Sequence, residues 1–238
     1  MRGPVIIALD VDNQTELMDF LQKFPKQDQL TVKIGMELFY GEGPELVKKL
    51  HELNYHIFLD LKLHDIPNTV RAGMKQIAQL GIDMTTVHAL GGAEMIAAAK
   101  EGLVEGSKLA GVPQPKLLAV TELTSISDDV LRNEQNCKLD MKDQVVSLAK
   151  TAKRAGADGV ITSPLEVQAL RKQVGTDFLY VTPGIRPKSA QSNDQKRIAT
   201  PEDAAKFGSS ALVVGRPIVQ ATDPVASYHN ILEAWQNA

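Results

Sequence analysis

Eight short apolar runs, rich in β-branched residues, recur along the chain with helical patterns between them. Most of these runs are continuous, as expected for parallel strands that are covered by helices on one face and packed into a barrel on the other. The predicted strands span residues 5–9, 30–34, 56–61, 84–87, 116–120, 159–162, 178–181 and 211–214. The predicted helices span residues 14–24, 43–53, 68–80, 93–99, 142–155, 165–174, 201–207 and 223–235.

Strand alternating with helix eight times predicts an α/β fold, a parallel eight-stranded (β/α)₈ (TIM) barrel. The chain has 238 residues and is 43% hydrophobic, which is enough for the core of one such barrel. No linker rich in proline, glycine or serine divides it, so we expect residues 1–238 to form a single domain. Polar stretches at 122–140 and 183–200 follow predicted strand ends, on the face where barrels carry out chemistry, and are candidate lids.

Composition argues against several classes of partner. The net charge is −3 and aromatic residues make up only 5%, which disfavours a nucleic-acid surface. The single cysteine, Cys137, allows no internal disulfide. No apolar run reaches membrane-spanning length and the first residues do not resemble a signal peptide, so we expect a cytoplasmic protein without membrane contact. Histidine spacing typical of a metal centre is missing, so no metal is predicted.

The stretch FLDLKLHDIPNTV places three charged residues in an otherwise apolar run: Asp60, Lys62 and Asp65. Residues two apart on a strand share a face, so the alternating leucines are expected to face the helix layer. Asp60 and Lys62 then point into the barrel at its carboxyl-terminal mouth, and Asp65 lies just beyond in the loop.

Two other strands carry charge at the same level. The first predicted strand is followed by Asp10 and the second contains Lys33. In a barrel these two side chains converge with Asp60 and Lys62 at one mouth. A purely structural ion-pair network is one interpretation, because paired charges tolerate burial. Charges converging from three strands favour a functional site, since each isolated buried charge costs on the order of several kcal/mol.

The alternation of acid and base also restricts the chemistry. A lysine between two carboxylates is held in its charged form. Such a lysine is a poor Schiff-base nucleophile, which must be neutral to attack. It suits the stabilisation of a developing negative charge, followed by delivery of a proton to it.

Glycine–arginine pairs follow the last two strands. VTPGIRP contains Gly184 and Arg186, and VVGRPI contains Gly215 and Arg216. The phosphate site of many barrels lies after strands seven and eight, and arginine binds phosphate in a bidentate manner. Together the two pairs predict a phosphorylated small-molecule substrate. His88 ends a predicted strand, so a role in the site is open.

These segments resemble the orotidine 5′-phosphate decarboxylase family, whose members catalyse the last step of UMP biosynthesis. The resemblance covers essentially the whole chain, and its most specific part is the D-x-K-x-x-D spacing within DLKLHDIPNT, residues 60–69. Seven further segments resemble the family, in the right order along the chain: IALD, VKIGMELFY, VHALGG, AVTELTS, NDQKR and the two glycine–arginine segments quoted above.

The resemblance implies a cofactor-independent decarboxylation of orotidine 5′-phosphate to UMP. Lys62 matches the proton donor and Asp60 the carboxylate beside the substrate's own carboxylate. Lys33 matches the lysine that bonds the ribose and braces Asp60. Asp65 matches an aspartate that enters the neighbouring subunit's site, with Ile66 and Thr69 beside it, which implies a homodimer. The remaining implied substrate-binding residues are Asp10 for the ribose, Thr124 and Ser125 for the pyrimidine, Arg186, Gln195, Gly215 and Arg216 for the phosphate, and Pro183 lining the loop.

Three alternatives stay open. The first is a Mg²⁺-dependent sugar-phosphate decarboxylase or synthase of the same barrel type, which Lys33 disfavours because a cation at the mouth opposes metal binding. The second is a non-catalytic barrel that binds a phosphorylated ligand. The third, a Schiff-base aldolase, is disfavoured by the paired carboxylates.

Overall fold

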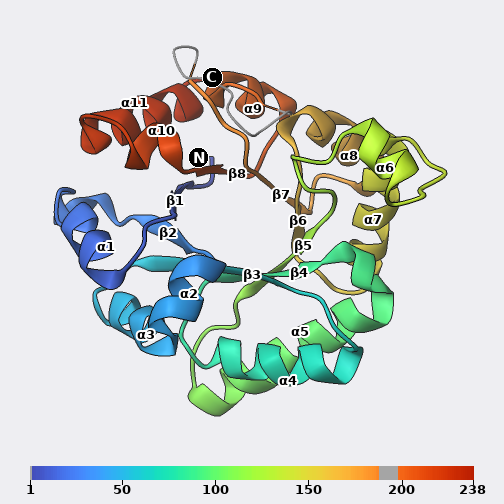
Figure 1. The fold of residues 1–238 in the computed structure, drawn as a ribbon, viewed down its shortest axis with the longest axis horizontal. Helices are drawn as coiled ribbons and strands as arrows, with labels where there is room; N and C mark the ends of the chain where they lie inside the picture. The colour runs from blue at the N-terminus through green and yellow to red at the C-terminus, as the bar shows by residue number, and fades with distance from the viewer. Residues whose placement is uncertain (1, 188–197) are drawn as a thin grey trace.

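Eight parallel strands close into a barrel, each paired with its neighbours in sequence and β8 with β1 (Figure 1). The computed structural model describes residues 2–187 and 198–238. The strands are β1 Val5–Leu9, β2 Thr31–Ile34, β3 His56–Leu63, β4 Met84–His88, β5 Lys116–Val120, β6 Gly159–Ile161, β7 Leu179–Thr182 and β8 Ala211–Val214. The predicted (β/α)₈ barrel is therefore confirmed.

Helices surround the barrel as an outer ring (Figure 1). The α-helices are α1 Gln14–Leu21, α2 Met36–Glu42, α3 Pro44–Glu52, α4 Pro67–Ala78, α5 Gly92–Ala110, α6 Asp128–Asn133, α7 Met141–Arg154, α8 Val167–Val174, α9 Pro201–Phe207, α10 Arg216–Val219 and α11 Pro224–Gln236. Short 3₁₀ turns are η1 Lys26–Asp28, η2 Ala89–Gly91 and η3 Pro164–Glu166.

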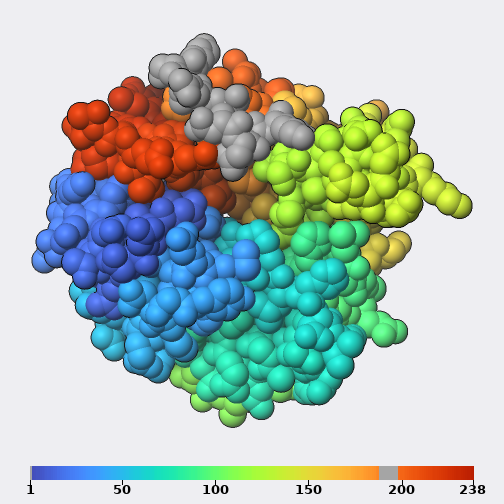
Figure 2. Space-filling model, viewed as in Figure 1, coloured from blue at the N-terminus to red at the C-terminus, as the bar shows by residue number. Residues whose placement is uncertain are grey.

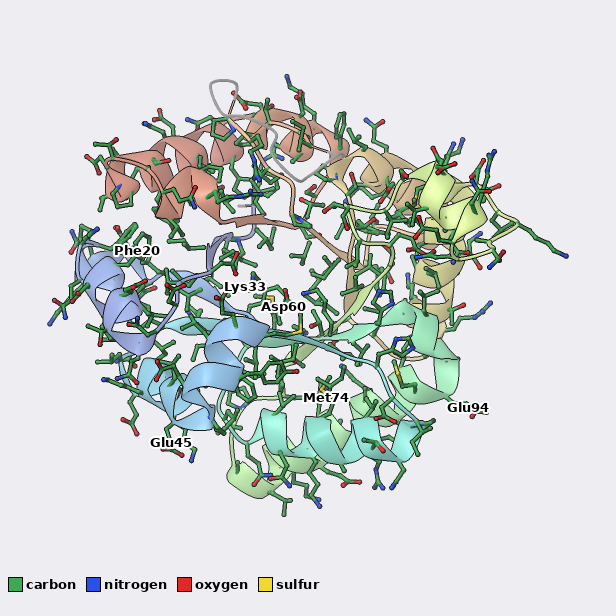
Figure 3. The ribbon with its side chains drawn as sticks, viewed as in Figure 1. Phe20, Lys33, Glu45, Asp60, Met74 and Glu94 are labelled. Carbon is green, nitrogen blue, oxygen red and sulfur yellow. The ribbon has the colours of Figure 1, made fainter. Side chains whose placement is uncertain are left out.

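Strand alternation sorts the side chains into two cores. On β1, Ile7 and Leu9 pack outward in the large core between strands and helices, whereas Ile6 and Ala8 pack inward with Phe58 in a smaller core inside the barrel. Figure 3 shows the same division, with Lys33 and Asp60 near the centre of the ring and Phe20, Glu45, Met74 and Glu94 in or against the helix layer. Inward-facing side chains at the carboxyl-terminal ends of the strands therefore lie at the mouth of the barrel.

The longest helix was predicted far too short. The predicted helix over 93–99 is observed as α5, of 19 residues, which continues through Gly102 and Gly106. These glycines lower helix propensity but let α4 approach closely, since a Cβ atom at either position would lie 2.2 Å from a carbonyl oxygen of α4. Tertiary packing thus outweighs the local preference, and the helix ends where Gly111 adopts a left-handed conformation.

Other differences concern short helices and the end of one helix. Helix α2, which directly follows β2, was not predicted, and the polar stretch 122–140 contains the short helix α6. The predicted helix over 14–24 ends three residues early, and the segment after β8 turns at once into α10. Helices of one or two turns carry too few apolar repeats to be recognised from periodicity.

Candidate active site

A cavity of about 480 Å³ lies at the carboxyl-terminal mouth of the barrel. The space-filling view shows a face that is hollowed near its centre (Figure 2). Ten residues predicted as site residues line this cavity: Asp10, Lys33, Asp60, Lys62, Thr124, Ser125, Pro183, Arg186, Gly215 and Arg216. The structure thus brings together segments that lie up to about 200 residues apart in the sequence, as a barrel mouth does.

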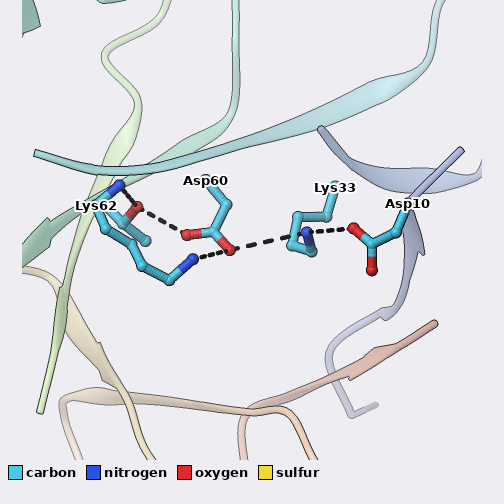
Figure 4. Close-up of polar contacts among 5 residues, drawn as sticks. Asp10, Lys33, Asp60 and Lys62 are labelled. Atoms are coloured by element: carbon cyan, nitrogen blue, oxygen red, sulfur yellow. Dashed lines mark hydrogen bonds and ion pairs between the residues drawn. The ribbon is translucent and has the colours of Figure 1, made fainter. Parts of the chain in front are cut away.

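Four charged side chains alternate in sign along one wall of the cavity (Figure 4). Lys33 Nζ lies 3.3 Å from Asp10 Oδ1 and 3.9 Å from Asp60 Oδ2. Lys62 Nζ donates a hydrogen bond of 2.9 Å to the same Asp60 oxygen. The Asp60 side chain is only 11% exposed, and the two ammonium groups balance its charge. A reacting group placed beside Lys62 would meet a fixed positive charge.

Gly35, at the end of β2, leaves room for this arrangement. A Cβ atom there would lie 3.2 Å from Lys33 Nζ and 3.7 Å from Asp10 Oδ1. A side chain at this position would crowd the ammonium group, so the glycine helps to keep Lys33 between its two carboxylates.

Lys62 has an unusual backbone. Its φ angle is +50°, in the left-handed region that non-glycine residues rarely adopt. The pairing of β3 with β4 is irregular between Leu59 and Leu63, so this stretch departs from a regular ladder. Such conformations cost on the order of 1–3 kcal/mol and concentrate at functional sites. The strain therefore falls on the residue whose side chain reaches into the cavity.

The phosphate end of the predicted site lies after β7 and β8. Arg186 is only 6% exposed, and its backbone N–H donates a 2.9 Å hydrogen bond to the carbonyl of Ala199. Arg186 Nη1 also donates to the carbonyl of Ile185 at 2.8 Å. Arg216 is the first residue of α10, directly after Gly215. Two guanidinium groups thus line the cavity that also contains Lys62.

Three predicted site residues lie outside the cavity wall of this chain. Asp65, Ile66 and Thr69 are exposed on the loop after β3 and the first turn of α4. The backbone N–H of Ile66 donates to Asp65 Oδ1 at 2.6 Å, which holds that carboxylate close to the loop. The predicted phosphate residue Gln195 lies outside the described residues.

Several lining residues were not singled out from the sequence. Their common feature is an inward position on a strand or in the segment just beyond it: Ala8, Phe58, Val120, Glu122, Leu123, Ile161, Thr162, Val213 and Gln220. Glu122 is 2% exposed and accepts hydrogen bonds of 3.4 Å from Gln135 and Gln144. Inward alternation along each predicted strand was the signal that could have identified most of them.

The open question about His88 is answered in part by its contacts. Its ring stacks on that of His64, with centroids 5.6 Å apart. Burial, followed by the charges of His64 and Lys62, lowers the pKa of His88 from its usual 6.5. The same burial and neighbouring charges that lower this pKa favour the neutral form of the His88 ring.

We expect an NMR titration to give His88 a midpoint below 6.5. Because the unfolded chain binds this proton more readily, stability should fall as pH drops below about 6.5 and should level off below the folded-state pKa. A His88→Asn variant should lose this part of the dependence of stability on pH. A midpoint at or above 6.5 would contradict the assignment.

Within residues 2–187 and 198–238, no cluster of three or more His, Cys, Asp or Glu side chains could hold a metal ion. None of the helices in these ranges has the length and apolar character needed to cross a bilayer.

Residues 3–231 match the model of the family described as Orotidine 5′-phosphate decarboxylase / HUMPS family. The chain belongs to this family. The resemblance seen in the sequence motifs is thereby confirmed.

Individual relatives support the membership along the whole chain. A protein from Lactobacillus johnsonii, named orotidine 5′-phosphate decarboxylase, is 62% identical over 97% of this chain and 98% of its own length. Another from Lactobacillus delbrueckii, with the same name, is 58% identical over 99% of this chain and 98% of its own length. The crystal structure of orotidine 5′-phosphate decarboxylase from Lactobacillus acidophilus aligns over both complete chains with a TM-score of 0.90 and 59% identity.

Proposed function

We propose that this protein converts orotidine 5′-phosphate to UMP and CO₂ without a cofactor, the last step of de novo UMP synthesis. The observation that carries the proposal is the row Asp10–Lys33–Asp60–Lys62, which lines the same cavity as Arg186 and Arg216. One end of the cavity suits a phosphate and the other offers a fixed ammonium group. The names of relatives that are 58–62% identical support the same substrate.

The chemistry follows from the charge that the reaction creates. When the bond between C6 and the carboxylate breaks, its electron pair stays on C6 in the plane of the pyrimidine ring. The ring π system lies perpendicular to that pair and cannot delocalise it. The Lys62 ammonium stabilises the negative carbon and then transfers a proton from Nζ to C6, which yields UMP.

Asp60 and Lys33 prepare Lys62 for this role. The 2.9 Å hydrogen bond to Asp60 restricts the rotation of the Lys62 ammonium group. We place Asp60 beside the departing carboxylate and assign Lys33 and Asp10 to the ribose hydroxyls. Thr124 and Ser125 would then meet the pyrimidine.

Arg186, Gly215 and Arg216 bind the phosphate in this proposal, with Gln195 as a fourth contact and Pro183 lining the loop. The phosphate is remote from C6 of the substrate. Its binding energy can therefore support closure of the site over the pyrimidine ring without stabilising the ground state at the reacting carbon.

The rival activities have less support. A Mg²⁺-dependent sugar-phosphate enzyme needs acids free to bind the metal, whereas Asp10 and Asp60 here flank the Lys33 ammonium. A simple phosphate-ligand binder has no use for a strained Lys62 backbone.

Turnover with purified protein tests the proposal. Orotidine 5′-phosphate is followed by the loss of its ultraviolet absorbance in the presence of EDTA, and sugar phosphates are tested in parallel with added Mg²⁺. Rapid, chelator-resistant loss supports the decarboxylase. Turnover of sugar phosphates alone would favour the metal-dependent rival, and binding of UMP without any turnover would favour the binding barrel.

We further propose that the working enzyme is a two-fold dimer in which Asp65 and Thr69 complete the partner's site. Both are exposed at the mouth of the barrel and lie outside the cavity of their own chain. The segments that follow β2, β3 and β4 also carry exposed apolar side chains: Met36, Tyr40, Ile66 and Leu90. A face with this composition is suited to association with a second copy.

Mixed dimers test this exchange of residues. Lys62→Ala and Asp65→Asn subunits are each inactive alone in this account. When co-expressed, half of the dimers are mixed, and each mixed dimer has one site with Lys62 from one chain and Asp65 from the other. We expect about a quarter of wild-type activity from this mixture. If Asp65 served its own chain's site, the mixture would be as inactive as its parents.

A further inference from the structure

Thr86 on β4 joins Asp60 and Lys62, the last two residues of the row Asp10–Lys33–Asp60–Lys62, through a single hydroxyl group. Its side chain is fully buried. Thr86 Oγ1 donates a hydrogen bond of 2.9 Å to Asp60 Oδ1 and accepts one of 2.9 Å from the backbone N–H of Lys62. A hydroxyl can do both at once, because it is a donor and an acceptor.

The first bond orients the Asp60 carboxylate. With Oδ1 bonded to Thr86, the other oxygen, Oδ2, is left to face Lys62 Nζ at 2.9 Å and Lys33 Nζ at 3.9 Å. Rotation of the carboxylate would break these contacts together. Thr86 thereby fixes which oxygen of Asp60 faces the two lysine ammonium groups.

The second bond supports the strained backbone of Lys62. Leu59 pairs with Thr85 and Leu63 pairs with Val87. Between these two pairs, three residues of β3 lie opposite a single residue of β4, Thr86. The Lys62 N–H is thus directed at the Thr86 side chain within this irregular stretch, and its φ angle is +50°. A buried N–H without a partner is costly, so the hydroxyl favours this backbone conformation.

We propose that Thr86 is a positioning residue for the decarboxylation, which fixes both the carboxylate of Asp60 and the backbone of Lys62. This inference rests on the proposed function. Thr86 does not line the cavity and therefore acts on the reaction through its two neighbours. Its loss should lower kcat much more than it changes ligand binding, because the residues assigned to the phosphate and the pyrimidine lie on the segments that follow other strands, β5, β7 and β8.

Thr85 offers a matched control one position away. It is equally buried on the same strand, but its Oγ1 has no hydrogen-bond partner among the described residues. Thr85→Val and Thr86→Val therefore make the same chemical change at adjacent positions, and only the second removes hydrogen bonds. Thr86→Ser keeps the hydroxyl and serves as the rescue variant.

We expect Thr86→Val to lower kcat by about 10- to 100-fold, as two lost hydrogen bonds imply, with KM and UMP affinity within about 3-fold of wild type. Thr86→Ser should retain most of kcat and Thr85→Val nearly all of it. Equal kcat in the two valine variants, or no rescue by serine, would overturn the proposal.

Amide hydrogen exchange of Lys62, measured by NMR, tests whether Thr86 holds the backbone of Lys62, and it does so without reference to turnover. The Lys62 N–H should be protected in the wild type and in Thr85→Val, and exposed to exchange in Thr86→Val. Rapid exchange in the wild type would overturn the inference even if Thr86→Val failed to fold. A wild type that protects this amide but leaves orotidine 5′-phosphate unchanged would refute the proposed function and support the structural role of Thr86.

Discussion

Replacement of Lys62 by alanine is expected to lower kcat for orotidine 5′-phosphate by at least about 10⁴-fold, because it removes the charge that stabilises C6 and the proton that reaches it. UMP affinity should change only a few-fold, since UMP carries no negative charge at C6. Asp60 would still have Lys33 at 3.9 Å and the Thr86 hydroxyl at 2.9 Å, so its buried charge keeps partners and the fold should persist. Initial rates and UMP titration measure the two effects.

Lys100→Ala is the control for loss of a lysine–aspartate pair. Lys100 Nζ lies 2.6 Å from Asp158, and its side chain is 25% exposed, close to the 28% of Lys62. It lies on α5, away from the cavity, so the variant should keep its kcat even if its melting temperature falls. Turnover of Lys62→Ala at the rate of Lys100→Ala would refute the proton-donor role.

Replacement of Arg216 by alanine is expected to weaken UMP binding by about 100-fold, because a guanidinium–phosphate contact supplies two charge-assisted hydrogen bonds. Uridine has no phosphate, so its weak binding should hardly change. Calorimetry or inhibition constants for the two ligands give the comparison directly.

Arg171→Ala provides the matched control. Arg171 lies on α8, donates to the carbonyl of Gly208 and does not line the cavity. This variant should bind both ligands as the wild type does. If Arg216→Ala weakened the binding of uridine and of UMP equally, Arg216 would not belong to the phosphate site.

Much of the site geometry was accessible from the sequence because strand alternation is a simple rule. Once β3 was recognised, Asp60 and Lys62 had to share a face, and the barrel closed that face onto Lys33 and Asp10. The rule does not reveal the irregular pairing of β3 with β4 or the left-handed backbone of Lys62. Those features depend on contacts between strands that no local pattern contains.

Thr86 illustrates the same limit. A threonine in a β-strand is an ordinary choice, and Thr85 beside it looks identical in sequence. Only the position of β4 against β3 distinguishes the hydroxyl that bonds Asp60 from the one that has no partner among the described residues. Asp65 and Thr69 pose a different problem, because their proposed role requires a second chain.

The most direct test of the whole account is the conversion of orotidine 5′-phosphate in D₂O with EDTA present, followed by proton NMR. We expect stoichiometric UMP that carries deuterium at C6, because the ammonium protons of Lys62 exchange with solvent. The absence of conversion by well-folded protein, or UMP that carries hydrogen at C6, would contradict it.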